Sequence, residues 1–393
     1  MRILMLNNEF PPLGGGTGTV NLMLLRQFAS VHNLTIDLIT SARGRYAEEE
    51  RFAAGIRLFK VPVNNRNIHH STARELLMYA FRAFPLAFNL HRNCRYDLCF
   101  AWSAVPAGLV AFLLRAFTRC SYIVRVCGPD IPGFERRYRL LYPMLSPVVR
   151  MIWRASKVVV AKCEGEANMI RAVDSTVPLS IIANGVDIAL FSPALLDEES
   201  GPLRILCVGR LIERKGQGHL IEAVKRLVEA GVDVILTLVG TGDALSLYQS
   251  RACSLGIADR VRFVGYVPRE EIPMYYAAAH VFVLPSYNEG MSVATLEAMA
   301  AGLPLVITRT GGSAELVEEG VNGFTFAWSD FDTLTMYLQR LASDHAMIRR
   351  MGAASRKRAA QFAWESIAVQ YLNLFGAMTN ALQEWTEDAR VNV

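Results

Sequence analysis

The chain has 393 residues, of which 52% are hydrophobic and 20% charged, with a formal net charge of +5. It is too long for one ordinary core, so two domains of about 150–200 residues are expected, and this composition excludes a disordered chain. The seven cysteines are scattered without a C-x-x-C pair. That pattern argues against a disulfide framework or a zinc site and is typical of a cytoplasmic protein.

Short apolar runs rich in β-branched residues alternate with helical stretches through the chain. In the first half, strands are expected at 2–7, 34–40, 56–63, 96–102, 121–126, 157–162 and 179–184. In the second half, they are expected at 203–209, 234–240, 261–267, 280–286 and 303–309. Nearly continuous apolar strands separated by helices are typical of parallel sheets covered on both faces. The sequence therefore predicts an α/β protein made of two Rossmann-like doubly wound domains.

The expected linker is 188–203, which carries prolines and an acidic cluster and shows no helical or strand period. This gives an N-terminal domain at 1–187 and a C-terminal domain at 204–364. The carboxyl edges of the two sheets are expected to face a shared cleft, where ligands of this fold bind. The last helix, within 365–393, is amphipathic. It either completes the second domain or packs back on the first.

Charge is distributed unevenly along the chain. Residues 1–195 hold 23 Lys and Arg against 13 Asp and Glu, whereas the remainder holds 18 against 23. A basic first half is typical of a domain that meets an anionic partner such as a lipid surface or a phosphorylated acceptor. A difference in solubility between two domains is the alternative. We expect no nucleic-acid partner.

Three apolar segments of the first half bear on membrane contact. The uncharged run 98–114 is divided by Pro106 and Gly108, so a buried strand followed by a helix is expected there and not a membrane span. Segments 71–93 and 133–157 mix basic residues with large apolar ones. They are typical either of interior helices of an α/β domain or of helices that dock on an anionic membrane surface. In the second case the protein would work at the inner face of the membrane.

A strand, an acidic loop and a helix follow one another from Pro285. The helix is expected to start near Ser292, and its unpaired N–H groups and dipole make its N-terminus an anion site. Ser292 would cap the helix or contact a phosphate, and Gly290 would let the backbone approach a ligand. Glu297, about one turn further in, is placed to accept hydrogen bonds from a ribose diol. Glu289 stays in the loop. Ordinary surface charges are the alternative for both glutamates.

Two cations follow a buried strand directly in LRILCVGRLIERKG. Arg210 and Lys215 lie within one short loop at the carboxyl edge of the second sheet. A bidentate Arg and a point-charge Lys are suited to a diphosphate, and together they would stabilise negative charge on a departing nucleoside diphosphate. Solvated loop cations are the alternative.

A glycine-rich turn from Gly14 to Gly18 joins the first strand to the first helix. Its spacing is not G-x-G-x-x-G, and no acidic residue closes a second strand about 20 residues on, which argues against a nicotinamide site. The turn would let the backbone pass close to a ligand, but taken alone it predicts only a tight strand–helix connection.

These motifs together resemble family-4 glycosyltransferases of the GT-B fold. The resemblance rests on Glu289-x7-Glu297, on Arg210 with Lys215 in GRLIERKG, on the Gly15–Gly16 turn and on the stretch ANGVD (183–187). It covers nearly the whole chain and is most specific in the second domain, from GRLIERKG to ELVEEGVNGF.

The resemblance implies a retaining, metal-independent transfer from a nucleotide sugar, in the cleft between two Rossmann-like domains. Arg210 and Lys215 would bind the diphosphate, and Glu297 the ribose. Glu289 would contact the donor-sugar hydroxyls, with Arg210, Lys215 and Glu289 as the catalytic set. The backbone of Gly290, Met291 and Ser292 would help to bind the donor, and Gly15 and Gly16 would approach its phosphate. The last helix would cross back to the first domain.

One departure from the family pattern concerns the acceptor side. Many members carry a histidine after the fifth strand of the first domain, where this chain reads RVCGPD with Cys127. Arg125 and Asp130 flank it and are candidate acceptor-side groups. A small buried residue is the commoner role for a free cysteine.

No metal site is expected. Asp330-Phe331-Asp332 imitates a D-x-D metal motif, but it precedes a helical run and is better explained as an N-cap. His69, His70 and His280 lack partners at ligand spacing. No cofactor is predicted, and the expected partners are a nucleotide sugar and a glycan or lipid-linked acceptor.

The function expected is a sugar transfer in polysaccharide, lipopolysaccharide or glycoconjugate biosynthesis. Three alternatives remain at this point. One is a catalytically silent sugar-nucleotide-binding protein, and the others are a nucleotide-sugar epimerase and a sugar phosphorylase of similar architecture.

Overall fold

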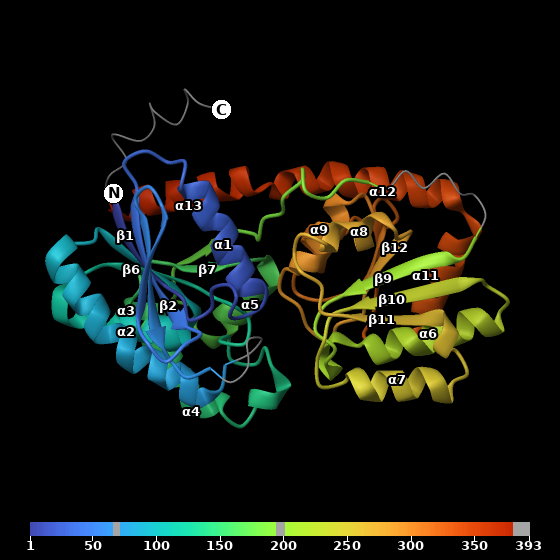
Figure 1. The fold of residues 1–393 in the computed structure, drawn as a ribbon, viewed down its shortest axis with the longest axis horizontal. Coiled ribbons are helices and arrows are strands. Elements are labelled where there is room, and N and C mark those ends of the chain that lie inside the picture. The colour runs from blue at the N-terminus through green and yellow to red at the C-terminus, as the bar shows by residue number, and fades with distance from the viewer. Residues whose placement is uncertain (66–70, 194–200, 380–393) are drawn as a thin grey trace. The chain divides into compact units, whose positions relative to one another are not determined.

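The computed structural model describes residues 1–65, 71–193 and 201–379. His69, His70, part of the expected linker and the end of the expected last helix lie outside these residues. The chain divides into two units (Figure 1). Unit 1 comprises residues 1–183 and the segment that begins at Trp364, and unit 2 comprises residues 184–363. The last helix thus belongs to unit 1.

Unit 1 is built on an eight-stranded sheet. In sheet order its strands are β3 (Glu48–Ala53), β4 (Ile56–Pro62), β2 (Thr35–Ala42), β1 (Arg2–Leu6), β5 (Leu98–Trp102), β6 (Tyr122–Arg125), β7 (Val159–Ala161) and β8 (Leu179–Ile181). From β4 to β8 all paired strands are parallel, and the central β5 is buried along its whole length. An apolar strand buried on both faces is typical of a doubly wound sheet.

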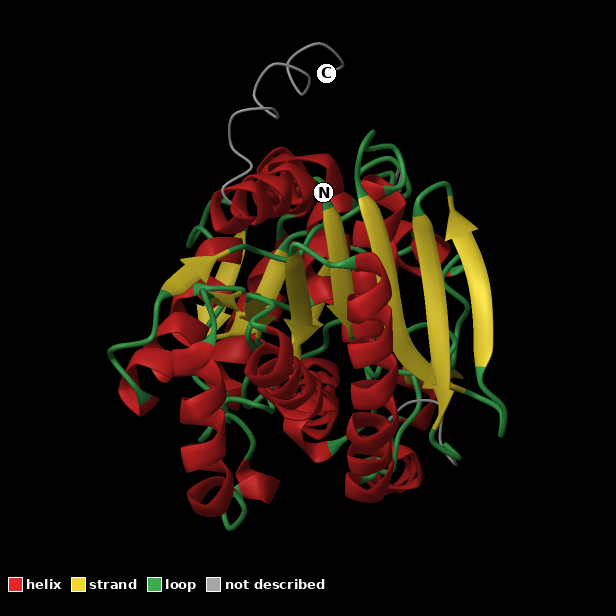
Figure 2. Cartoon of the chain, turned by 90° about the vertical axis from the view of Figure 1, so that its left-hand side faces the viewer, coloured by secondary structure: helices red, strands yellow, loops and turns green. Residues whose placement is uncertain are grey.

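The prediction of purely parallel sheets is wrong at one edge, because β3 pairs antiparallel with β4 (Figure 2). Its sequence, EEERFA, is mostly charged and exposed, so it carried no apolar signal. Lys60 of β4 bonds to Glu50 of β3 at 2.6 Å. A charged edge strand also discourages pairing with another chain.

Helices cover both faces of the unit-1 sheet. They are α1 (Gly16–Phe28), α2 (Ala73–Cys94), α3 (Leu109–Thr118), α4 (Tyr142–Ala155), α5 (Glu164–Val173) and α13 (Trp364–Thr379). Helices α2 to α5 share one apolar core with the sheet. On the other face α13 packs against α1 and β5, where Phe375 contacts the rings of Phe28 and Phe100.

Unit 2 is a six-stranded parallel sheet. In sheet order its strands are β11 (Val261–Gly265), β10 (Val234–Val239), β9 (Leu203–Val208), β12 (Val281–Leu284), β13 (Leu305–Thr308) and β14 (Gly323–Phe326). This is the doubly wound order 3-2-1-4-5-6, whose chain reversal lies between β9 and β12. Its helices are α6 (Gln217–Glu229), α7 (Leu245–Ser254), α8 (Ile272–Ala277), α9 (Val293–Ala300), α10 (Ser313–Leu316), α11 (Phe331–Ser343) and α12 (His345–Ala359).

The uncharged run 98–114 folds as expected, into the strand β5, a short irregular turn and the beginning of α3. Among the described residues, no helix is long and apolar enough to cross a membrane.

A buried histidine lies at the amino edge of the unit-2 sheet, just before β12. His280 is 4% exposed, and its Nδ1 accepts the backbone N–H of Arg204 at 3.1 Å. Its Nε2 lies 3.0 Å from the guanidinium of Arg204. Burial, followed by the charges of Arg204 and His345, lowers the pKa of His280 to about 4. The native protein therefore holds this imidazole neutral.

We expect His280 to make stability fall as pH falls from 6.5 toward about 4. The unfolded chain binds the proton near pH 6.5, whereas the native chain resists it until about pH 4, so acid favours the unfolded state. The loss should reach about 3 kcal/mol once pH is below both pKa values. Urea unfolding of His280→Gln, which cannot titrate, should show a flatter stability–pH profile. The exposed His32→Gln is the control, and a native profile in H280Q would contradict the assignment.

Candidate functional site

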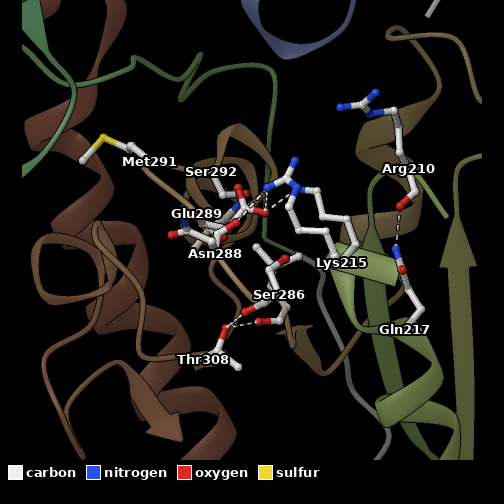
Figure 3. Close-up of polar contacts among 12 residues, drawn as sticks. Arg210, Lys215, Gln217, Ser286, Asn288, Glu289, Met291, Ser292 and Thr308 are labelled. Carbon is white, nitrogen blue, oxygen red and sulfur yellow. Dashed lines mark hydrogen bonds and ion pairs between the residues drawn. The ribbon is translucent and has the colours of Figure 1, made fainter. Parts of the chain in front are cut away.

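The carboxyl ends of β9 and β12 bring a lysine and a glutamate together. These strands are parallel neighbours, so the loops that follow them meet at one edge of the sheet. A short turn after β9, Glu213–Lys215, carries Lys215, and the loop after β12 carries Glu289. Lys215 Nζ lies 2.5 Å from Glu289 Oε1, and both side chains are mostly buried (Figure 3). The structure thus joins two of the three predicted catalytic residues.

Electrostatics keep the Glu289 carboxylate ionised. Burial alone would raise the pKa of Glu289, but the charges of Lys215 and Arg214 and the hydrogen bond from Lys215 outweigh burial and lower it. Arg214 was missed in the sequence. Its Nη1 donates to the carbonyl of Asn288 at 2.8 Å and lies 3.8 Å from Glu289 Oε1. As the neighbour of Lys215 in GRLIERKG, it could have been proposed as a third cation of the loop.

Arg210 is not part of this ion pair. Its side chain is exposed, and its guanidinium lies apart from Lys215 and Glu289 (Figure 3). Its backbone carbonyl accepts a hydrogen bond from Gln217 Nε2 at 2.9 Å, which ties the loop to the first turn of α6. The diphosphate contact expected of Arg210 stays a prediction.

The helix that follows Glu289 begins as expected. Ser292 is the N-cap of α9, and its hydroxyl accepts the backbone N–H of Thr295 at 3.3 Å. Of the two roles considered for Ser292, the structure shows the cap. A small pocket at the start of this helix is lined by Glu289, Gly290, Ser292 and Gly312. The backbone there is polar, with unpaired N–H groups at the start of α9.

Two residues outside the loop hold its backbone in place. Asn184, buried in unit 2, donates from Nδ2 to the carbonyl of Met291 at 2.8 Å. A Cβ atom on Gly312 would lie 1.9 Å from the carbonyl oxygen of Gly290, so only glycine fits there. The sequence pointed to Asn184 only as part of the motif 183–187, and it did not point to Gly312. Both contacts fix the path of the Gly290–Met291 backbone.

Glu297 lies on the same helix but makes different contacts. Its carboxylate accepts a hydrogen bond from the hydroxyl of Tyr276, on α8, at 2.9 Å and lies 3.5 Å from Arg269. Burial raises the pKa of Glu297, and Arg269 and Tyr276 only partly offset it. Glu297 does not line the pocket that holds Glu289. Its expected contact with a ribose therefore stays a prediction, and Tyr276 and Arg269 are partners that sequence reasoning missed.

The glycine-rich turn lies at the carboxyl edge of the unit-1 sheet. Gly15 precedes α1 as its N-cap, and Gly16 is its first residue. The N–H of Gly15 donates to the carboxylate of Glu9 at 3.2 Å, and a Cβ on Gly15 would meet no atom within 4 Å. The backbone at Gly15 is thus uncrowded, as a close approach to a ligand would require.

Arg125 lies inside unit 1. It is 2% exposed, its Nε donates to the hydroxyl of Tyr371 at 2.9 Å, and its guanidinium lies 4.5 Å from the centre of a Trp102 ring. Tyr371 belongs to α13, so Arg125 ties the last helix to the sheet. The predicted acceptor-side role of Arg125 is untested, and these contacts favour a structural one.

Asp130 and Cys127 form a tight loop. The carboxylate of Asp130 accepts the backbone N–H groups of Ala104 and Cys127, each at 2.8 Å, and burial raises the pKa of Asp130. Burial, with the nearby charge of Asp130, raises the pKa of the Cys127 thiol to about 12. The thiol is therefore neutral at physiological pH, and the acceptor-side roles expected of Cys127 and Asp130 stay predictions.

The described part of the chain contains no group of three or more His, Cys, Asp or Glu side chains placed to share a metal ion. The N-cap interpretation of Asp330 is confirmed, because its carboxylate accepts the backbone N–H of Thr333 at 3.0 Å and begins α11.

Solved structures share the fold of both units. Sucrose-phosphate synthase from Thermosynechococcus elongatus matches with a TM-score of 0.85 at 23% identity, over 97% of this chain and 100% of that one. An Anabaena protein solved with UDP-glucose matches with a TM-score of 0.76 at 20% identity, over 96% of this chain and 100% of that one. The fold is therefore that of the GT-B class, with two parallel-sheet α/β domains.

Sequence relatives narrow the class to a family. The description "Glycosyltransferase Family 4" matches residues 14–190, and "Glycosyl transferases group 1" matches residues 193–358. A D-inositol 3-phosphate glycosyltransferase from Corynebacterium diphtheriae is 30% identical, over 96% of this chain and 94% of that protein. A GDP-mannose-dependent phosphatidylinositol monomannoside mannosyltransferase from Mycolicibacterium smegmatis is 26% identical, over 97% of this chain and 100% of that protein. The chain belongs to glycosyltransferase family 4.

Membership of this family decides between the functions considered for the sequence. The protein is a glycosyltransferase, which favours sugar transfer in glycoconjugate biosynthesis over the epimerase, the sugar phosphorylase and the silent binding protein.

Proposed function

We propose that this glycosyltransferase moves a sugar from a nucleoside-diphosphate sugar to a hydroxyl of a glycan or lipid-linked acceptor, with retention of anomeric configuration and without a metal ion. The observation that carries the proposal is the contact of Lys215 with Glu289 beside the N-terminus of α9. The pocket there offers a separate partner to each part of such a donor. The cation and the backbone N–H groups suit the diphosphate, and the ionised acid suits the sugar.

The phosphate end of the donor is matched by the positive groups of the pocket. Lys215 provides a point charge, and the start of α9 adds backbone N–H groups and the positive end of a helix dipole. In the transition state negative charge grows on the departing diphosphate, and these groups stabilise it more than they stabilise the intact donor. They supply the charge that a metal ion supplies in other enzymes.

The sugar end is matched by Glu289. Because its pKa is lowered, the carboxylate is ionised at neutral pH and accepts hydrogen bonds from sugar hydroxyls. Its oxygen is held by Lys215, so it serves as a positioned acceptor and not as a mobile nucleophile. We infer that the acceptor attacks from the face of the departing diphosphate, and that a diphosphate oxygen takes the proton from the acceptor hydroxyl.

The donor and acceptor classes draw support from the relatives. The mycobacterial relative is named for GDP-mannose and a phosphatidylinositol mannoside, and the corynebacterial one for inositol 3-phosphate. A sugar nucleotide as donor and an anionic, lipid-linked or phosphorylated acceptor are consistent with both and with the basic first half of this chain.

The test is a thermal-shift screen in EDTA against UDP, GDP, ADP and their common sugar conjugates, because a ligand that binds the native state alone raises its stability. The conjugate that stabilises the protein is then used as donor, and the anomeric configuration of the product is read by NMR. We expect stabilisation by one nucleotide series, metal-free turnover and a retained configuration. An inverted product would overturn retention, and turnover abolished by EDTA would overturn metal independence.

A further inference from the structure

The outer surface of the helix layer α2, α3 and α4 in unit 1 exposes large apolar side chains. Eight of those that the described residues leave exposed lie there or in the turn before α4, at Leu77, Phe81, Phe117, Leu140, Leu141, Met144, Leu145 and Met151. The helices are neighbours, since α2 packs on α3 and α3 on α4, and all lie on one face of the sheet (Figure 1). Large exposed apolar side chains gathered on one layer of helices in this way mark an interaction site.

Helix α4 shows the feature most clearly, because it is apolar on both sides. Its inner side buries Tyr142, Val149 and Trp153 in the core of unit 1. Met144 and Met151, seven residues apart, lie on the opposite side, and they are 76% and 43% exposed. A helix needs one apolar side to join a core, so the second requires another partner.

The charge of this layer is almost entirely positive. Residues 136–157 contain six Lys and Arg and no Asp or Glu. In α2 and α3 the sole acid is Glu75, which is buried and bonds to the backbone N–H of Thr72 in the N-cap of α2. Arg150 lines an apolar groove of about 620 Å³ beside Phe112 and Met151.

We propose that this layer is a docking surface for an anionic lipid bilayer. The exposed side of α4 that carries Met144 and Met151, the α4 stripe, would insert among the headgroups. Large apolar side chains interleaved with arginines are the composition of an interfacial helix. A second copy of the chain fits less well, because a two-fold interface would bring the same arginines face to face. For segments 71–93 and 133–157, membrane docking is thus favoured over purely interior helices. The proposal does not depend on which donor the enzyme uses.

The orientation that follows places the amphipathic layer of unit 1 at the water–lipid boundary. The exposed Arg136 and Arg139 precede the stripe and would meet lipid phosphates, while Met144 and Met151 would enter the apolar boundary. Each cation near an anionic surface contributes about fivefold in binding, and this contribution falls with salt.

The experiment is vesicle flotation of the full chain. Vesicles of phosphatidylcholine with about 30 mol% phosphatidylglycerol are compared with pure phosphatidylcholine, at about 50 mM and about 500 mM salt. We expect binding to the anionic vesicles at low salt and much weaker binding in the other conditions. The double variant Met144→Ser with Met151→Ser should bind at least tenfold less. Arg136→Ser with Arg139→Ser should bind about 25-fold less and lose most of the salt dependence.

Matched controls separate docking from loss of fold. Leu247 and Met274 of unit 2 are similarly exposed, at 65% and 62%, so Leu247→Ser with Met274→Ser should float like the native chain. All variants should keep the native melting temperature and the native thermal shift with nucleotide. The thermal shift tests the proposed donor site independently of vesicle binding.

Several outcomes would overturn the proposal. One is a native chain that does not float on anionic vesicles at low salt. Another is that the double variant Met144→Ser with Met151→Ser floats as well as the native chain and the control variant. A third is a native dimer that this double variant dissociates without any vesicle binding, which would assign the surface to a second copy.

Discussion

Replacing Lys215 by methionine should lower kcat/KM by about 10²–10³. Methionine keeps most of the apolar stem and removes the charge that the departing diphosphate would meet. The loss should appear mainly in kcat, because the charge on the leaving group is greatest in the transition state. Initial rates at several donor concentrations separate the two constants.

A second lysine provides the matched control for this variant. Lys225 lies on α6 of the same unit, and its Nζ is 3.3 Å from Glu229, so Lys225→Met also removes a cation from an ion pair. It should turn over like the native enzyme. If K215M stays within threefold of native while its donor affinity is also unchanged, Lys215 does not stabilise the leaving group.

Adding one methyl group at Gly312 should weaken donor binding by at least about tenfold and lower turnover with it. The new Cβ would lie 1.9 Å from the carbonyl oxygen of Gly290, so backbone must move. That backbone leads directly into Met291 and the cap of α9, where the proposed phosphate groups are. Nucleotide titration by thermal shift, together with initial rates, measures both effects.

The control for Gly312→Ala is Gly44→Ala. Gly44 lies in unit 1, and its nearest contact for an added Cβ is Glu48 Oε1 at 3.7 Å, an ordinary packing distance. G44A should bind the nucleotide as the native chain does. Equal nucleotide affinity in G312A and the native chain would show that the Gly290 backbone has no part in holding the donor.

Much of the architecture could be predicted from apolar runs. All twelve expected strands form, because each is a short apolar stretch bounded by turn residues. The strands β3 and β14 were missed for two reasons. One is mostly charged and exposed, and the other has only four residues, one of them Gly323. Such strands form because a neighbour offers hydrogen bonds, and that pairing is not visible in their own residues.

The parts of the site that lie at strand ends could be predicted from the sequence. The parts that depend on contacts between loop backbones could not. Lys215 and Glu289 each follow a strand of one parallel sheet, so their approach follows from topology. The contact of Gly312 with Gly290 depends on two loops whose separation no spacing rule gives. The structural contacts of Arg125 were not predictable for a related reason. The sequence placed it at a strand end, but alternate residues face opposite sides of a sheet, and its side is covered by α13.

The ion pair between Lys215 and Glu289 also bears on which anions the enzyme would ignore. Because the Lys215 ammonium is already paired with Glu289, it should bind free phosphate weakly. Inorganic phosphate also has no hydroxyl-rich sugar that could replace Lys215 as the hydrogen-bond partner of the carboxylate. The proposed donor, a sugar nucleotide, would compensate both partners at once, with phosphate oxygens for the ammonium and hydroxyl groups for the acid. An enzyme built in this way would remain receptive to its donor in a cell crowded with simpler phosphates.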